Sequence, residues 1–247
     1  MKSSGTARLA AAIVVLCVCG FPGTARSVAD EFPAVNGVVS VVRKTKSAVD
    51  NSDVAIWLKP VAEAGRAAGL ALPRLRLKIL QHNKRFEPRL LVVPVGSVVD
   101  FPNEDPFFHN VFSLFDGKRF DLGLYEAGTS RSVAFTNLGI CYIFCNIHPE
   151  MSAVVVVVDT PYYAVSNRAG EFTVPNVPPG RYALSVWHER HKPERPDEYP
   201  REVRISQAST SLGVIRLIES DQVIAPHKNK YGKDYNPPKP TSPIYKK

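Results

Sequence analysis

The fold of this chain is decided by one stretch, GICYIFCNIHPEM, which spans residues 139–151. Its apolar first half predicts a β-strand that ends at Cys145. The residues that follow offer an imidazole at His148 and a thioether at Met151. A second loop, NEDPFFHNV at 103–111, lies upstream and enters another predicted strand with His109 at the junction. The sequence therefore predicts that two imidazoles, a thiolate and a thioether lie together.

This set of donor groups favours copper. Two imidazoles and one thiolate in a plane, with a weak thioether on the axis, suit copper and its one-electron couple, because the soft sulfur ligands stabilise Cu(I) while imidazoles also accept Cu(II). Structural zinc is the main competitor for a His/Cys set, but it rarely uses a thioether. A lone Cys, Met or His is usually an ordinary core residue. Their joint occurrence in this pattern predicts one mononuclear copper site with the ligands His109, Cys145, His148 and Met151.

The rest of the sequence predicts an all-β protein. Short apolar runs alternate with Pro, Gly, Asn and Asp turns, which is typical of β-sandwiches. The predicted strands are 37–42, 54–58, 75–80, 90–93, 97–101, 110–113, 132–135, 140–145, 153–159, 171–174, 182–186, 202–205 and 213–217. The Ala-rich stretch 61–71 is helix-prone, and we expect it to be a linker or a surface helix.

The pattern Cys-x2-His-x2-Met, preceded by Pro-x2-His-Asn-Val at 106–111, resembles the cupredoxins, and the ligand loop is spaced as in amicyanin. The resemblance covers residues 75–158 and implies a Greek-key cupredoxin β-sandwich with the four ligands named above. It also implies that Asn110 helps to fix the Cys-bearing loop. By the same resemblance, His148 reaches the surface through an apolar patch and passes the electron. The whole chain further resembles bacterial methylamine utilization proteins, through FPN at 101–103, FCNIHP at 144–149 and VWHE at 186–189.

Cys141 lies four residues before Cys145, and this spacing resembles the binuclear copper site of respiratory oxidases. The loop is one residue short of that pattern between the second Cys and the His. In a strand with a rise of about 3.3 Å per residue, the two Cys lie about 13 Å apart. That separation is too long for a shared metal, and a disulfide needs Cα atoms within about 7 Å. We therefore expect Cys141 to be a core residue, with the binuclear site as the alternative.

A second module is predicted around the copper segment. Gly170-x-Phe172 and the following PPGRY at 178–182 resemble the carboxypeptidase regulatory-like, or transthyretin-like, sandwich. That family opens with a Gly-x-Val strand and a strand like AIWLKP, and both occur far upstream, at 37–39 and 55–60. The hypothesis is that residues 34–60 and 160–218 form one smaller transthyretin-like β-sandwich into which the cupredoxin domain, 75–158, is inserted. Insertion at an exposed loop whose ends lie close together is physically reasonable.

The first residues predict an exported protein. Lys2 and Arg8 precede a short apolar run at 9–19, and small residues at 27–29 match a signal-peptidase site. Residues 1–29 are therefore expected to be a signal peptide, which implies a periplasmic protein with no stable membrane insertion; an uncleaved membrane anchor is the alternative. Removal of three basic residues and no acidic one lowers the net charge from +8 to +5. Nucleic acid is a poor partner, because no basic stripe with interleaved aromatic residues occurs. Residues 219–247 are expected to form a basic, Pro-rich tail that is extended or disordered.

Two functions fit these expectations. The first is single-electron transfer to or from a protein redox partner, such as a dehydrogenase or a cytochrome, with an acidic partner favoured by the positive charge. The second is copper holding or assembly, in which copper is cargo or structural and the second sandwich and the tail bind a partner. We do not expect an enzyme, because no second set of copper ligands, Ser/His/Asp set or paired carboxylates stands out. His188 is expected to be a strand-end residue bonded to backbone or Glu189, with a second metal site as the alternative, and His82, His191 and His227 are expected at the surface.

Overall fold

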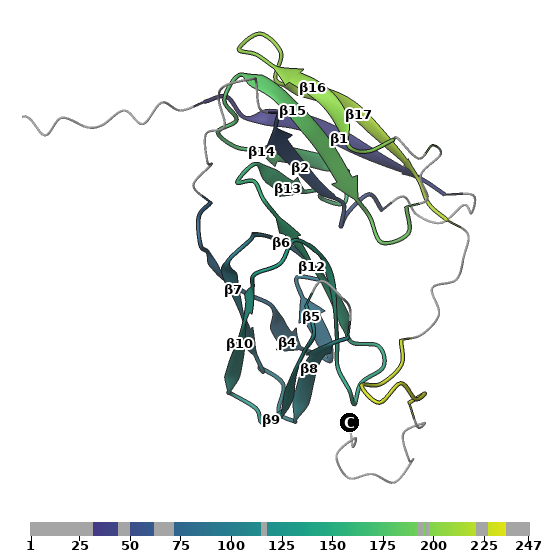
Figure 1. Ribbon diagram of the computed structural model, residues 1–247. Coiled ribbons are helices and arrows are strands. Elements are labelled where there is room, and N and C mark those ends of the chain that lie inside the picture. Colours follow the sequence, from purple (N-terminus) through teal and green to yellow (C-terminus); the bar gives the residue numbers. More distant parts are fainter. Residues whose placement is uncertain are drawn as a thin grey trace, which may run out of the picture. The chain divides into compact units, whose positions relative to one another are not determined.

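The computed structural model describes residues 32–43, 50–61, 72–114, 118–191, 195, 198–220 and 227–235. Within these ranges the chain forms seventeen β-strands and no helix, so the all-β prediction is confirmed (Figure 1). The predicted signal peptide and nearly all of the predicted linker at 61–71 lie outside the described residues. The described part of the chain contains no helix long and apolar enough to cross a membrane.

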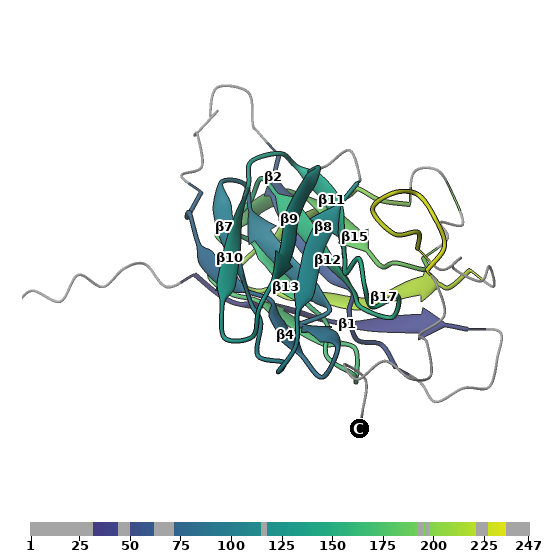
Figure 2. The same cartoon turned by 90° about the horizontal axis from the view of Figure 1, so that it is seen from below.

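Strands from the middle of the chain form the sandwich that carries the predicted ligands, called here the central sandwich. Its larger sheet has the order β6–β12–β11–β8–β9, and a second sheet has the order β10–β7–β3. Figure 2 shows β7 and β10 on one side of this sandwich, with β8, β9, β11 and β12 on the other. A short hairpin of β4 and β5 completes it. The strands are β3 (Arg76–Lys78), β4 (Leu80–His82), β5 (Arg85–Glu87), β6 (Leu90–Pro94), β7 (Ser97–Pro102), β8 (His109–Ser113), β9 (Phe120–Tyr125), β10 (Ser130–Phe135), β11 (Gly139–Phe144) and β12 (Ser152–Val158).

The apolar strand β12 shows why this sheet forms. It is parallel to β6 and antiparallel to β11, so both of its edges are hydrogen-bonded. Almost every residue is buried, as expected for a strand covered on both faces. Alternate side chains, such as Val155 and Val157, enter the core of the central sandwich. The intervening ones, such as Val154 and Val156, belong to a second apolar cluster that also contains Ala55 and Trp57.

Strands from both sides of the central sandwich in the sequence form two further sheets, called here the flanking sandwich. In the first sheet β1 is antiparallel to β14 and parallel to β17, and in the second β2 lies between β13 and β15, with β16 beyond. The strands are β1 (Val35–Val42), β2 (Ala55–Pro60), β13 (Tyr163–Val165), β14 (Glu171–Val174), β15 (Gly180–Trp187), β16 (Arg201–Ile205) and β17 (Ser211–Ile218). Side chains of both sheets share one buried apolar cluster, which includes Val39, Leu184 and Leu217. Residues far apart in the sequence thus share one core.

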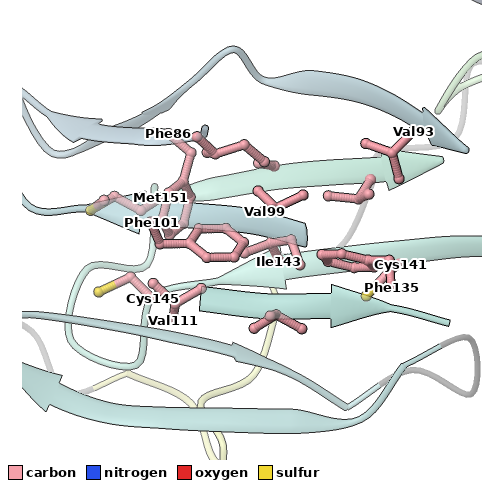
Figure 3. Close-up of a cluster of buried hydrophobic side chains, with 14 of the residues drawn as sticks. Phe86, Val93, Val99, Phe101, Val111, Phe135, Cys141, Ile143, Cys145 and Met151 are labelled. Atoms are coloured by element: carbon pink, nitrogen blue, oxygen red, sulfur yellow. The ribbon is translucent and has the colours of Figure 1, made fainter. Parts of the chain in front are cut away.

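The core of the central sandwich leads to the predicted metal ligands. Figure 3 shows Cys145 and Met151 at one end of this cluster and Cys141 at the other. Cys145, Met151 and Cys141 are each no more than 1% exposed. Cys141 in β11 and Cys145 directly after this strand therefore lie at opposite ends of one apolar core.

Candidate metal site

The loop between β11 and β12 is closed on itself by backbone hydrogen bonds. The N–H of Cys145 donates to the carbonyl oxygen of Met151 at 3.2 Å, and the N–H of Met151 donates to that of His148 at 3.1 Å. Both flanking strands are in register up to this point, with Phe144 opposite Ser152. The antiparallel ladder thus holds the loop from both ends, and the turn directs three predicted ligand residues to one side.

Three donor atoms from this loop and from the start of β8 meet in the interior. The Nδ1 atoms of His109 and His148 lie 3.1 Å apart, and the Sγ atom of Cys145 lies 3.9 Å from the first and 3.6 Å from the second. All three residues are buried. Among the described His, Cys, Asp and Glu side chains, these three lie close enough together to hold a metal ion. Two imidazole nitrogens and a thiol that converge in an apolar interior form a donor set that fits a soft or borderline metal such as copper.

Met151, the fourth predicted ligand, is fully buried beside this group. Its side chain belongs to the same apolar cluster as Cys145, and its backbone is bonded to both Cys145 and His148. Figure 3 shows the Met151 and Cys145 sulfur atoms at the same end of the cluster. The thioether therefore lies at the end of the core where the three donor atoms converge.

Asp105 orients one of the imidazoles, and sequence reasoning missed it. Its Oδ2 atom lies 2.8 Å from Nε2 of His109, and the carboxylate also accepts the backbone N–H groups of Asn83 and Lys84 at 2.7 and 2.9 Å. Because the carboxylate accepts, the Nε2 atom of His109 carries the proton and its Nδ1 lone pair faces Cys145. Carboxylates that fix a ligating imidazole in this way are a common feature of metal sites. The available signal was an acid four residues before the His in a predicted loop.

Burial keeps both imidazoles neutral. It is the largest cause that lowers the pKa of His148, to about 4, and the neighbouring His109 lowers it further. Burial also lowers the pKa of His109, although Asp105 acts in the opposite direction. A neutral imidazole has a free nitrogen lone pair, so both side chains are in the form that binds a metal.

Burial is the largest effect on the Cys145 thiol and raises its pKa. Hydrogen bonds from the backbone N–H groups of Asn110, Ile147 and His148 to the sulfur act in the opposite direction and only partly offset it. A metal ion supplies the positive charge that removes the thiol proton. Asn110 acts on the loop through its backbone, whereas its side chain donates to Asp121 Oδ1 at 2.7 Å.

An aromatic ring closes the site on the histidine side. The Phe107 ring lies 5.2 Å from the His109 ring and 5.7 Å from the His148 ring, measured between centroids. Its neighbour Phe108 is 54% exposed, whereas His148 is 4% exposed. The imidazole of His148 is thus largely covered, with an exposed apolar residue close by in the His109 loop.

The remaining Cys and His residues lie apart from this group. Cys141 is buried and its Sγ contacts Ser113 Oγ at 3.3 Å, as expected for a core residue. His188 follows β15 and is partly buried, with no hydrogen-bond partner for its Nδ1 in the described part of the chain. His82 is exposed as expected. The surface prediction is wrong for His191, whose side chain is 7% exposed and bonded to the Ile218 carbonyl, and for His227, whose ring stacks on Phe144.

Comparison with known proteins finds solved structures that are similar to part of the chain. No protein-family model matches the sequence, and no curated protein sequence matches it. The chain is similar to a purple cupredoxin from Nitrosopumilus maritimus, with 24% identity and a TM-score of 0.30 over 33% of this chain and 99% of that one. It is similar to a Cu(I) mutant of amicyanin, with 23% identity and a TM-score of 0.32 over 42% of this chain and 98% of that one. A Cu-containing nitrite reductase from Thermus scotoductus SA-01 has 26% identity and a TM-score of 0.34, with 41% of this chain but only 26% of that chain covered.

Proposed function

We propose that this protein is a mononuclear copper protein of the cupredoxin type that transfers single electrons to or from a protein partner. The observation that carries the proposal is the buried convergence of His109 Nδ1, His148 Nδ1 and Cys145 Sγ, with Met151 beside them. Copper held by two imidazoles, a thiolate and a thioether supplies a one-electron couple. We assign no enzyme activity to the chain.

The residues around the donor atoms prepare them for this role. Asp105 holds the proton on the far nitrogen of His109, so that the near nitrogen is free. Backbone N–H groups stabilise a thiolate at Cys145, and the apolar core excludes water from its sulfur. The ligand loop is closed by its own backbone hydrogen bonds. Ligands held in this way need little rearrangement when the metal changes oxidation state.

We further propose that the partner approaches near Phe107 and Phe108 and is acidic. Phe107 contacts both imidazoles, and the Lys84 Nζ atom lies 5.6 Å from the centre of its ring. With residues 1–29 removed as a signal peptide in a periplasmic protein, the net charge of the chain is +5. An acidic partner would be steered by this charge, and its association rate would fall as salt is added.

The visible spectrum of the protein reconstituted with Cu(II) tests the proposal. An intense thiolate-to-copper band that is lost and regained on rapid one-electron reduction and oxidation supports electron transfer. A colourless Cu(I) protein that gives its metal readily to a chelator would instead support copper holding. A protein that binds no copper at either oxidation state would refute both.

A further inference from the structure

The described segment 227–235, drawn in yellow in Figure 1, contacts the ligand loop, although the sequence predicts a tail without such packing. The hydroxyl of Tyr235 donates a hydrogen bond to the carbonyl oxygen of Cys145 at 2.6 Å. The backbone N–H of Lys230 donates to Asn146 Oδ1 at 2.9 Å. The segment thus bonds two consecutive residues of the loop, one of them a proposed ligand.

The segment makes two further contacts with the central sandwich. The His227 ring stacks on Phe144, the last residue of β11, with 4.1 Å between centroids. The Lys230 ammonium lies 2.7 Å from Asp121 Oδ2, and the other oxygen of Asp121 accepts the side chain of Asn110. Because the backbone N–H of Asn110 bonds the Cys145 sulfur, Lys230 is linked to the metal site through Asp121.

Hydrogen bonds within the segment hold its shape. The N–H of Asn229 donates to the Lys233 carbonyl, and that of Gly232 donates to the Asn229 carbonyl, both at 2.9 Å. The ends meet, since the hydroxyl of Tyr235 lies 3.3 Å from Nδ1 of His227. A loop braced in this way presents Tyr235 and Lys230 to the ligand loop in fixed positions.

We propose that segment 227–235 is a clamp on the metal site, with Tyr235 as the positioning residue that holds the Cys145 loop in its metal-binding conformation and slows the release of the metal. This inference rests on the proposed function for the identity of the metal. The ligands already lie within one buried group, and the clamp limits the opening of the loop through which a bound ion leaves.

The variant Tyr235→Phe tests the clamp, because it removes one hydroxyl and keeps the ring. Tyr231→Phe is the matched control in the same segment, since Tyr231 is 72% exposed. Two quantities are measured on the full chain: amide hydrogen exchange of residues 145–151 in metal-free protein, and the rate at which a chelator removes copper from loaded protein. We expect faster amide exchange in Tyr235→Phe and no change in the control. We also expect copper release to be about tenfold faster, because losing a group that hydrogen bonds a metal ligand typically lowers metal affinity by about this factor.

The two measurements separate failure of the clamp from failure of the proposed function. Unchanged exchange in Tyr235→Phe overturns the clamp, whatever the copper result. Faster exchange with unchanged copper release overturns its role in metal retention. If the wild-type protein binds no copper, the proposed function fails, and the exchange of the metal-free protein alone then decides whether Tyr235 holds the loop.

Discussion

Asp105 and His109 form a buried pair in which the carboxylate has a role of its own. Asp105 is 4% exposed and accepts three N–H groups, two from backbone and one from the imidazole. A buried carboxylate is stable only when such donors satisfy it. The pair therefore fixes both the position of the His109 ring and the nitrogen that faces Cys145.

Asp105→Asn is expected to weaken copper binding about tenfold, because an amide does not hold the His109 proton as a carboxylate does. Competition with a chelator of known affinity measures the change. Glu104→Gln is the matched control, since Glu104 is the adjacent acid and is exposed. Equal copper affinities for the two variants would show that Asp105 does not support the ligand.

The predicted ligands could be recognised at the residue scale because their types and spacing are unusual together. His109, Cys145 and His148 meet as expected, and Met151 lies beside them. Asp105 and Tyr235 could not be recognised in the same way. Their roles depend on where one loop and a distant segment lie in space, and an Asp or Tyr in a polar stretch of sequence is normally solvated.

At the scale of elements, a buried charged group joins the strands of the smaller sheet in the central sandwich. The carboxylate of Asp100 on β7 accepts two hydrogen bonds from the Arg76 side chain on β3, both at 2.8 Å. It also accepts one from the Ser132 hydroxyl on β10 at 2.5 Å. The bond from Ser132 is the largest cause that lowers the pKa of Asp100, and Arg76 also lowers it. The ionised carboxylate therefore stabilises the folded state.

Asp100→Asn is expected to reduce the free energy of unfolding by about 1 kcal/mol at pH 7. The pKa of Asp100 is lower in the folded than in the unfolded state, so its contribution is present above the unfolded value of 3.8 and is lost as the pH falls below it. The difference between variant and wild type should therefore shrink at pH 3. Urea denaturation at both pH values measures this, and an equal difference at the two would contradict the assignment.

The turn before β14 depends on Gly170. Its φ of +88° lies in the region that favours glycine, and a Cβ there would collide with the carbonyl oxygen of Val39 on β1. The same turn brings the N–H of Val39 to the Gly170 carbonyl at 2.7 Å. Close approach of these two backbones pairs β1 with β14, so this glycine is required by the flanking sandwich.

Gly170→Ala should lower the free energy of unfolding by more than about 1 kcal/mol, because the new side chain meets both an unfavourable φ and a backbone oxygen. Gly180→Ala serves as the control, since the nearest atom to a Cβ at Gly180 lies at an ordinary 3.5 Å, on the Tyr182 ring. Chemical denaturation compares the two. Similar losses in both variants would argue against this account of the turn.

The element scale also shows where strand prediction from sequence fails. The strands β5, β9 and β13 lie outside the predicted strands, and β4 shares only Leu80 with the predicted strand 75–80. In β9 the sequence FDLGLY contains Asp121 and Gly123, which are typical of turns, and Leu124 is 55% exposed. Pairing with β8 and a bulge between Asn110 and Phe112 hold this edge strand, and such tertiary pairing outweighs local preference.

At the scale of the whole molecule, the flanking sandwich is built from two separated parts of the chain. The strand β1 pairs with β17 in parallel over residues 36–42, and β2 lies between β13 and β15. The hypothesis of one domain made of residues 34–60 and 160–218 stays a prediction. The transthyretin-like assignment of this sandwich remains a prediction.

Cleavage tests the split arrangement. A protease recognition sequence inserted after Val61, once cut, should leave residues 34–60 bound to the rest of the chain under native conditions. Size-exclusion chromatography with mass spectrometry would detect both fragments in one peak, because β1 and β2 are each hydrogen-bonded on both edges. Release of residues 34–60 as a free folded piece would contradict the hypothesis.

The central claim is a single mononuclear site that uses Cys145 and excludes Cys141. The most direct measurement is the copper content and visible spectrum of Cys141→Ser and Cys145→Ser beside the wild type. Cys141 lies at the far end of the core, so Cys141→Ser should keep one copper per chain and its thiolate-to-copper band, whereas Cys145→Ser should lose the band. Two copper ions in the wild type, or loss of the band in Cys141→Ser, would contradict the mononuclear site.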